Sequence, residues 1–503
     1  MRELELKLEV DEPFVTPPLA AEEGPVGGIE ELAPLDLRAT YCDTADLRLA
    51  RHGLTLRHRT GEADHPAWSL KLPLDEDAAT REELHFDGSE RRVPEEVLDL
   101  VTAFARGAAV APVARLRTKR RRWSLRDAHG GEVAELVDDR VSVLRGGRVA
   151  DRFRELEIES RTMNRAGIEG IARVLQRAGA SEPKTVPKVM RALGPKAFEP
   201  PDFVVRDSLS PDDPAAYAVQ TALGRGLRRI LVNDAGARLG DEEAVHQMRV
   251  GARRLRSDLR TFKPLLAAGA ADTVRELRGE LRWLGDALGG VRDLDVIGAR
   301  LRERAEGLDA DLEPLFSLIE ARHAERREAL MDVLRSDRYV ALLNSLVLAN
   351  HSPPLDVSAW EPARVALPSL VAKPLRKLRR GGRALGPDDD AKDYHQVRIR
   401  AKRARYGAEA VAPALGRKRG RAAARLAKRA AKLQDLLGEL QDSVVARELL
   451  SEVRALHAQD RSLGFGLGRL YEREEQADRD ARAAFPRRWK KLDRKKARRW
   501  LTS

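Results

Sequence analysis

The sequence has a single cysteine, Cys42, which excludes an intramolecular disulfide framework and any metal site built on several thiolates. Aromatic residues make up only 4% of the chain, which disfavours a platform of stacked rings for single-stranded nucleic acid. No apolar run approaches the roughly 20 residues that a membrane-spanning helix needs. The chain also opens on charged residues instead of an apolar signal core. We therefore expect a soluble cytoplasmic protein that does not associate with membranes.

What the chain has in excess is charge, and this charge is unevenly distributed. Lysine and arginine number 92 against 80 aspartates and glutamates, which gives a net charge of +12 and a pI near 9.8. Residues 1–200 carry a net charge of −4, whereas residues 201–503 carry +16. A basic second half of this kind indicates either a polyanionic partner or a solvated arginine-rich surface.

The hydrophobic periodicity of the sequence also differs between the two halves. Short alternating stretches before about residue 160 predict β-strands, and long Ala/Leu/Arg/Glu segments with a helical period dominate the second half. A chain of 503 residues exceeds what one hydrophobic core usually organises. We expect an α+β multidomain protein, with a strand-rich domain over residues 1–195, a proline-rich linker over residues 196–213 and an all-helical domain over residues 214–500.

Charged and apolar residues alternate along the predicted strands. Glu3, Glu5 and Lys7 share one face of the first strand, and leucines occupy the other. One such stretch would suit an ordinary half-exposed strand, but the pattern recurs in six stretches with both signs of charge. A closed barrel with a polar lumen, whose leucines pack outward under helices, would explain this recurrence. Carboxylates in such a lumen can share a hard divalent cation, and arginines and lysines can bind phosphate oxygens.

Several motifs in this half resemble, in order, those of the CYTH family, the triphosphate tunnel metalloenzymes. They are Glu3-x-Glu5-x-Lys7, the stretch from Tyr41 to Thr44 with Leu47 to Leu49, the stretch from Leu54 to Arg59, and the stretch from Pro187 to Leu193. The resemblance covers residues 1–195 and implies an eight-stranded antiparallel β tunnel with helices. No phosphate-binding loop of the GxxxxGK[ST] type is present, so a P-loop NTPase is disfavoured.

The resemblance to CYTH proteins also implies the roles of individual residues. Mg²⁺ or Mn²⁺ would be bound by Glu3, Glu5, Asp138, Glu155 and Glu157. The triphosphate would be held by Lys7, Arg57, Arg59, Lys71, Arg120 and Lys188. Between Arg117 and Arg122 the strand register stays open, because a shift of one residue exchanges Arg120 for Lys119 or Arg121. Arg81 and Glu83 are weaker candidates.

The second half contains an internal repeat at an offset of 149 residues. The segment from His246 to Arg256 matches the segment from His395 to Arg405, and a later pair of segments follows at the same offset. Equal offsets for two segments indicate a duplicated helical unit, with copies at about 217–350 and 365–500.

Each copy carries a histidine that begins a stripe of cations on one helical face. The stripes are His246, Arg249, Arg253, Arg256 and Arg260 in the first copy, and His395, Arg398, Lys402 and Arg405 in the second. Like charges at this spacing repel, so each stripe needs either a bound polyanion or acidic partners from a neighbouring helix. The acidic candidates are Asp286, Asp293, Asp435 and Asp442. Neither histidine has a nearby Cys or His at metal-ligand spacing, which disfavours a zinc site.

The repeat resembles the CHAD family, the histidine-bearing α-helical domains that often follow a CYTH domain. The resemblance rests on the two stripes and spans the entire repeat. It implies two four-helix bundles related by a pseudo-twofold axis, and a basic central groove in which the stripe residues bind inorganic polyphosphate. It also implies association with polyphosphate granules.

These features predict metal-dependent hydrolysis of inorganic triphosphate or polyphosphate in the first domain, together with polyphosphate binding by the second. Resemblance to CYTH also admits a thiamine triphosphatase and, last in order, an adenylate cyclase. The alternative is a non-catalytic protein that binds or senses polyphosphate. Nucleic acid is a disfavoured partner, because aromatic residues are few and no DNA- or RNA-binding motif is present. The sequence leaves the oligomeric state open.

Overall fold

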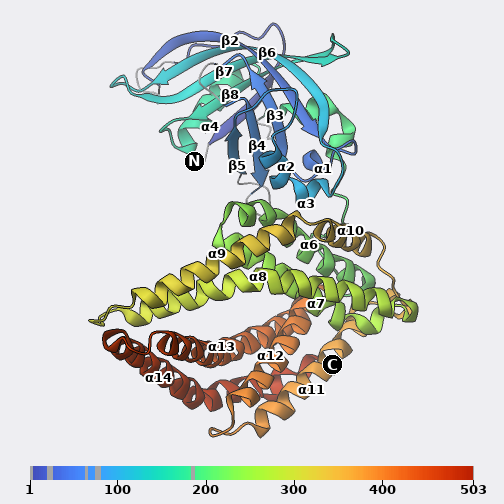
Figure 1. Ribbon diagram of the computed structural model, residues 1–503. Helices are drawn as coiled ribbons and strands as arrows, with labels where there is room; N and C mark the ends of the chain where they lie inside the picture. The colour runs from blue at the N-terminus through green and yellow to red at the C-terminus, as the bar shows by residue number, and fades with distance from the viewer. Residues whose placement is uncertain (1–3, 20–25, 63–65, 74–80, 183–186, 502–503) are drawn as a thin grey trace. The chain divides into compact units, whose positions relative to one another are not determined.

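The computed structural model describes residues 4–19, 26–62, 66–73, 81–182 and 187–501 (Figure 1). The chain divides into two compact units, residues 1–201 and 202–503. The first unit is an antiparallel sheet with short helices, and the second unit is helical. The predicted fold class, a mixed first part followed by an all-helical second part, is confirmed.

Eight strands of the first unit form one sheet in the order β1-β8-β7-β6-β2-β3-β4-β5, and each neighbouring pair is antiparallel. The strands are β1 (Glu5–Val10), β2 (Gly28–Asp43), β3 (Thr55–Thr60), β4 (Trp68–Pro73), β5 (Arg81–Phe86), β6 (Ala111–Arg126), β7 (Glu132–Arg145) and β8 (Arg148–Ser160). Strands β1 and β5 end the order and do not pair with each other within the described residues. The sheet is therefore curled around its inner face without a closed ring of hydrogen bonds.

The short helices of this unit lie between or after the strands. They are α1 (Arg48–Arg51), α2 (Glu95–Leu100), α3 (Thr102–Ala105), α4 (Arg165–Arg177) and α5 (Lys188–Leu193). Helix α4 begins after Asn164, whose side-chain oxygen accepts a hydrogen bond from the Gly167 amide at 2.9 Å. Strands β7 and β8 are joined by Gly146 and Gly147, whose φ angles of 56° and 78° suit a two-residue hairpin turn.

The outer face of strands β1, β7 and β8 is apolar and is covered by α4. The buried residues of this cluster include Leu8 and Val10 of β1, Leu136 of β7, Leu156 and Ile158 of β8, and Ile168, Ile171 and Leu175 of α4. Because side chains alternate along a strand, this packing turns Glu5, Lys7 and Glu157 toward the inner face. The expectation that leucines pack outward under a helix is met here.

The inner face of the curled sheet has two different regions. Near α5 it is apolar, since Tyr41, Leu116 and Val141 pack against Val189 and Ala192 of that helix. The remaining inner face is lined by charged side chains. Helix α5 thus covers one part of the inner face and presents its first residue, Lys188, to the charged part.

The second unit is built from nine helices in the described part of the chain. They are α6 (Ala215–Leu239), α7 (Glu242–Thr261), α8 (Ala271–Ala305), α9 (Glu313–Arg335), α10 (Asp337–His351), α11 (Ala363–Ala384), α12 (Ala391–Val411), α13 (Arg421–Leu456) and α14 (Arg461–Leu492). The offset of 149 residues superposes α6–α9 on α11–α14 in order, and in each half successive helices pack on one another.

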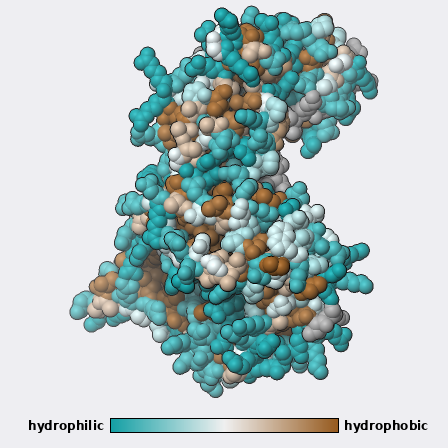
Figure 2. All heavy atoms as spheres, turned by 90° about the vertical axis from the view of Figure 1, so that its right-hand side faces the viewer, coloured by the Kyte–Doolittle hydropathy of each residue, from teal (hydrophilic) through white to brown (hydrophobic). Residues whose placement is uncertain are grey.

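The two halves of this unit share a hydrophobic contact. Leu301 of α8 and Leu315 of α9 pack with Leu450 of α13 and Leu470 of α14. Helix α7 of the first half also packs against α12 of the second. On the face drawn in Figure 2, hydrophilic side chains cover most of the molecular surface. No helix among the described residues is both long and apolar enough to cross a bilayer.

Candidate functional site

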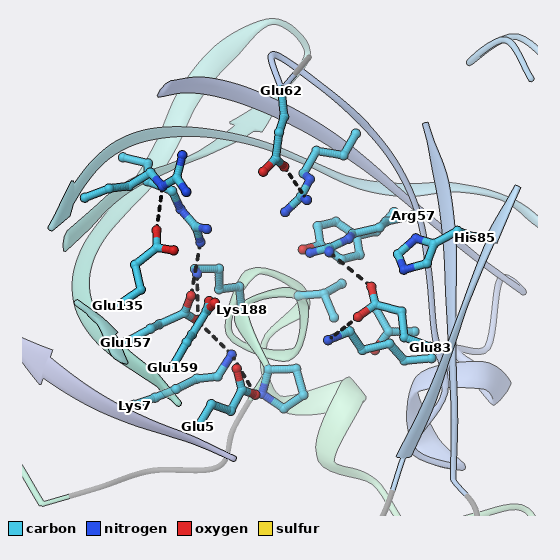
Figure 3. Close-up of a pocket in the computed structure, with 18 of the residues that line it drawn as sticks. Glu5, Lys7, Arg57, Glu62, Glu83, His85, Glu135, Glu157, Glu159 and Lys188 are labelled. Carbon is cyan, nitrogen blue, oxygen red and sulfur yellow. Dashed lines mark hydrogen bonds and ion pairs between the residues drawn. The ribbon is translucent and has the colours of Figure 1, made fainter. Parts of the chain in front are cut away.

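The charged inner face of the curled sheet encloses a cavity of about 250 Å³ (Figure 3). Eight lysine and arginine side chains and six glutamates line it, and its walls come from β1, β3, β4, β5, β6, β7, β8 and the start of α5. Figure 3 shows side chains from opposite walls pointing toward a common centre. A cavity of this composition suits a small ligand that carries several negative charges and binds with metal ions.

Glu157 on β8 is the centre of one cluster in the cavity. Its carboxylate lies 2.7 Å from the Lys7 Nζ, 3.0 Å from the Lys188 Nζ and 3.0 Å from an Arg120 nitrogen. Asp139 on β7 contacts the same cations, at 2.6 Å from the Lys188 Nζ and 2.7 Å from Arg120. Three cations therefore converge on two buried carboxylates, which fixes the position of each ammonium and guanidinium group.

A second cluster lies on the opposite wall, on strands β3, β4 and β5 (Figure 3). The Lys71 Nζ lies 2.8 Å from the Glu83 carboxylate, and an Arg57 nitrogen lies 3.4 Å from its other oxygen. Arg57 also donates a hydrogen bond to the Ser69 hydroxyl at 3.0 Å. Arg59 pairs with Glu62 at 2.5 Å. Basic groups therefore face each other across the cavity.

The pKa shifts in the first cluster follow from burial and from this pairing. Burial would lower the pKa of Lys188, but Glu157, Asp139 and Glu155 raise it above its ordinary value. Burial would raise the pKa of Glu157, but Lys188, Lys7 and Arg120 hold it well below its ordinary value. Glu155 and Glu159 behave differently, because burial raises the pKa of each. The cluster thus combines a fully ionised centre with two carboxyl groups that take up protons more readily.

The structure brings most of the sequence-predicted tunnel residues together. Those that line the cavity are Glu5, Lys7, Arg57, Arg59, Lys71, Arg120, Glu157 and Lys188. Glu155 is buried behind them, with one oxygen 2.9 Å from the Lys188 Nζ. Glu3 lies outside the described residues. The register left open on β6 places Arg120 in the cavity wall, while Arg121 is exposed and pairs with Glu31 at 2.9 Å.

Asp138 is the predicted residue that does not reach the cavity, and its assignment is corrected here. It lies on the opposite face of β7, buried against Arg154, with two oxygen–nitrogen contacts of 2.8 Å. The neighbouring residue Asp139 takes the inward position. The alternation on β7 could have shown this, because Ala134 and Leu136, on the same face as Asp138, pack outward against the α4 cluster.

Other cavity residues were not assigned from the sequence. They are Tyr41, Glu62, His85, Arg122, Glu135, Glu159 and Arg161. Glu135 joins two of them, at 2.5 Å from Arg122 and 2.7 Å from Arg161. Glu159 continues the alternation of Glu155 and Glu157, so the period of two was the signal that could have identified it.

The carboxylates of the cavity have the chemistry that a hard divalent cation prefers. Glu5 on β1 lies opposite Glu159 on β8, and Glu157 and Glu155 follow on the same strand. Within the described part of the chain, no group of three or more Asp, Glu, His or Cys side chains is gathered closely enough to hold an ion. Lys7 and Lys188 lie between the carboxylates instead. The oxygen donors fit Mg²⁺ or Mn²⁺ in type, but here they are paired with lysines and are not gathered around one point.

The second unit carries the two predicted cationic stripes on α7 and α12. Arg249 and Arg253 of α7 lie close enough to Arg398 and Lys402 of α12 to affect their ionisation. The pKa of Lys402 is lowered to about 8, mainly by burial and to a smaller extent by repulsion from Arg398, Arg253 and Arg249. The Nε atoms of Arg253 and Arg398 are buried and have no hydrogen-bond partner among the described residues. Four cations from the two repeats thus form one cluster, which we call the central basic cluster.

The acidic partners considered for the stripes compensate this cluster only in part. Asp293 pairs with Arg249 at 2.7 Å, and Asp442 attracts Arg398 and Lys402 without an ion pair within the described residues. Asp286 lies within 3.8 Å of Arg282 instead.

The remaining stripe residues lie in other surroundings. The His395 Nδ1 contacts the Gln441 side-chain oxygen at 2.6 Å, and Arg405 pairs with Glu409 at 2.8 Å. Burial and the charge of Arg292 lower the pKa of His246. Burial also lowers the pKa of Arg256, which is only partly offset by Asp286.

Comparison with known proteins identifies the family. The CYTH domain model matches residues 1–192, and the CHAD domain model matches residues 221–451. The uncharacterized protein Rv2226 of Mycobacterium tuberculosis is 32% identical over 521 residues, which cover 98% of this chain and 96% of that protein. The chain therefore belongs to the family of proteins that join a CYTH domain to a CHAD domain.

Solved structures show similarity to each domain separately. The CHAD domain from the plant Ricinus communis is 31% identical, covers 55% of this chain and 93% of its own, and has a TM-score of 0.46. The Hippeastrum protein HpAC1, described as having a dominant triphosphatase activity, is 16% identical over 38% of this chain and 93% of its own, with a TM-score of 0.21. CYTH proteins are metal-dependent enzymes that include triphosphatases and cyclases, and both domains are associated with triphosphate or polyphosphate binding. The chain is thus a triphosphate-related tunnel protein.

Proposed function

We propose that the first unit hydrolyses inorganic triphosphate, or the end of an inorganic polyphosphate chain, in its cavity. The observation that carries this proposal is the lining, in which eight lysines and arginines and six glutamates surround about 250 Å³. A triphosphate needs several cations around a short chain, and this cavity supplies them from opposite walls.

The lining also bears on the choice of substrate. Tyr41 is its only aromatic residue apart from His85, and Pro187 and Val189 are its only apolar side chains among the described residues. Pockets for drug-sized organic ligands are usually larger, about 300–1,000 Å³, and mostly apolar. These features favour an inorganic chain over thiamine triphosphate and, further, over a nucleotide that a cyclase would use.

Each group of residues has a distinct part in the proposed reaction. Lys7, Arg120 and Lys188 would exchange their carboxylate partners for phosphate oxygens, and Arg57, Arg59 and Lys71 would hold the other end of the chain from the opposite wall. Glu5, Glu155, Glu157 and Glu159 would hold Mg²⁺ or Mn²⁺, which supplies Lewis-acid stabilisation of charge on the phosphate oxygens. Two walls of cations would keep the chain extended and in line for attack by water.

For the second unit, we propose that the central basic cluster binds inorganic polyphosphate. The lowered pKa of Lys402 and of Arg398, each caused by burial and by neighbouring arginines, supports this proposal. An anion between α7 and α12 would relieve the repulsion and would pair with the buried Nε groups. Such binding would direct the protein to polyphosphate granules.

Phosphate release from tripolyphosphate, measured with and without Mg²⁺ or Mn²⁺, tests the proposed hydrolase. Arg120→Ala should lower kcat/KM on the order of 100-fold, because it removes a charged group that contacts the phosphate chain. Arg121→Ala is the matched control on the same strand, since its side chain is exposed on the outer face and should leave turnover unchanged. A wild-type chain that binds tripolyphosphate with either metal and releases no phosphate would be a sensor instead of a hydrolase.

A further inference from the structure

The second unit contains a basic pocket that is separate from the central basic cluster. It has a volume of about 800 Å³ and lies among α7, α11, α12 and the short 3-10 helix Lys263–Leu265. Seven lysine and arginine side chains line it, and no aspartate or glutamate does so among the described residues. Arg260, the last residue of the stripe on α7, lines it, whereas the other eight stripe residues do not. On α12 the pocket uses Arg400 and Arg403, which project from a different side of the helix than Arg398 and Lys402.

The internal repeat supplies a comparison for this pocket within the same chain. Arg254 of α7, in the first half, forms an ion pair with Glu409 of α12, in the second half. The offset of 149 residues maps Arg254 onto Arg403 and Glu409 onto Arg260. The contact equivalent to that ion pair therefore joins two arginines, both of which line the pocket. One of the two equivalent contacts thus has a cation and an anion, and the other has two cations.

A second carboxylate is missing from the same place. Asp258 lies 3.5 Å from Arg254 and is fully buried beside it, whereas its equivalent at the offset of 149 residues is Gly407. In the described residues, no carboxylate forms an ion pair with Arg260 or with Arg403. The pKa of Arg260 is lowered, mainly by burial and to a smaller extent by repulsion from Arg403, Arg278 and Arg256. Bringing these charges together costs free energy, which an anion between them would recover.

The apolar part of the pocket bears on the kind of anion. Pro264, Leu370, Pro374 and Ile399 line it beside the basic residues. An inorganic phosphate chain has no apolar surface to place against these side chains. An organic group attached to phosphates would cover them, and the volume lies in the range of small-molecule pockets.

We propose that this pocket binds a small organic phosphate, such as a nucleoside triphosphate, with its phosphate groups between Arg260 and Arg403. Arg400 and Lys377 would contribute further contacts to the phosphates, and Leu370 and Ile399 would contact the organic group. The site is independent of the tunnel and of the central basic cluster, so it goes beyond the function proposed above.

The test is the binding of ATP to the full-length protein, measured by calorimetry in the presence of EDTA to prevent hydrolysis. The decisive variant is Arg260→Glu, which places a carboxylate beside Arg403 as Glu409 does beside Arg254. We expect ATP affinity to fall at least about tenfold, because an anionic partner now occupies the site. The melting temperature should stay at or above that of the wild type, so loss of binding would not reflect unfolding. Arg403→Gln should also weaken ATP binding.

Two comparisons separate this site from the other anion sites. Lys402→Ala in the central basic cluster and Lys71→Ala in the tunnel should leave the Arg260-sensitive ATP binding unchanged. Inorganic tripolyphosphate should show a smaller loss on Arg260→Glu than ATP, because it lacks the organic group. The proposal is overturned if ATP binds equally well to Arg260→Glu, or if tripolyphosphate alone shows the Arg260-sensitive binding.

Discussion

Individual cations in the two units have opposite electrostatic surroundings. In the tunnel, burial is outweighed by Glu157 and its neighbours, which raise the pKa of Lys7 and Lys188. In the central basic cluster, burial and neighbouring arginines lower the pKa of Lys402 to about 8. A phosphate chain in the tunnel must therefore compete with carboxylates already in place, whereas an anion at Lys402 meets cations that are compensated only in part. We therefore expect the tunnel to select among anions, and the central basic cluster to bind any polyanion.

The pKa of Lys402 gives the polyphosphate affinity a specific dependence on pH. Because the proposed binding of polyphosphate requires the charged ammonium, affinity should fall severalfold as the pH rises from 7 to 9 through the folded-state pKa of about 8. Lys402→Arg should bind with little change over this range, since a guanidinium stays charged. Fluorescence anisotropy with labelled polyphosphate at constant ionic strength measures both proteins. Equal pH profiles for the two would contradict the role given to Lys402.

The lowered pKa of Lys402 also affects stability. A higher pH should weaken polyphosphate binding but should stabilise the ligand-free protein. A lysine whose pKa is lowered from 10.5 to about 8 on folding binds fewer protons in the native state between these pH values. The free energy of unfolding of the ligand-free protein should therefore rise with pH across this window, relative to Lys402→Met. Urea unfolding at pH 7.5 and 9.5 would show a smaller rise, or none, in the variant.

At the scale of an element, strand β7 carries two adjacent buried carboxylates that point to opposite faces of the sheet. Asp139 faces the cavity and contacts Lys188 and Arg120, while Asp138 faces outward and holds Arg154. Arg154 in turn donates to the carbonyl oxygens of Glu12 and Phe14 at 2.7 and 2.8 Å. The inner carboxylate thus positions the residues that would bind phosphate, and the outer one anchors the segment after β1 to the sheet.

Substitution of the two aspartates should separate these roles. Asp139→Asn should lower kcat for tripolyphosphate at least tenfold, because Lys188 and Arg120 lose a fixed partner. Asp138→Asn should lower the free energy of unfolding by about 3 kcal/mol, because it leaves the buried Arg154 without its counterion. The folded fraction of that second variant should keep its turnover. Urea unfolding and phosphate release, measured on both proteins, would refute the assignment if Asp138→Asn were stable and inactive.

The sequence predicts those parts of the site that depend on a pattern within one strand. It does not predict the parts that depend on how the sheet curves. The alternation on β1 and β8 predicts the inward position of Lys7 and Glu157, because a period of two fixes the face of each side chain. The pair Asp138 and Asp139 puts an acid on each face, so only the apolar packing of Leu136 decides between them. The opposite wall, with Glu83 and His85, faces this cluster only because the sheet curls. Curvature of that kind has no signature in the sequence of one strand.

In the second unit, too, the sequence predicts local equivalence but not the contacts that depend on helix packing. The offset of 149 residues predicts that His246 and His395 are equivalent, and the helices correspond in order. It does not predict that Arg253 and Lys402 lie close together, because that depends on how α7 packs against α12. Nor does it predict that Arg260 lies near Arg403, since the equivalent contact, between Arg254 and Glu409, is an ion pair.

At the scale of the whole molecule, one chain joins a small charged cavity to a helical surface with a central basic cluster that acidic residues compensate only in part. A polymer held by that cluster stays attached to the protein, so its ends reach the cavity at a raised effective concentration. This effect requires a ligand long enough to occupy both sites at once. Tripolyphosphate gains nothing from it, whereas long-chain polyphosphate does.

Kinetics on the two substrates should therefore respond differently to changes in the cluster. The double variant Arg398→Ala/Lys402→Ala in the full-length chain should raise KM for long-chain polyphosphate about tenfold, because capture of the polymer is lost. Its kcat and KM for tripolyphosphate should match the wild type, since neither residue lines the cavity. Arg326→Ala/Arg376→Ala, which removes two exposed charges elsewhere on the helical unit, controls for the altered net charge. If KM for both substrates rises together, the cluster acts by general electrostatic attraction and not by tethering, and high salt should then abolish the difference.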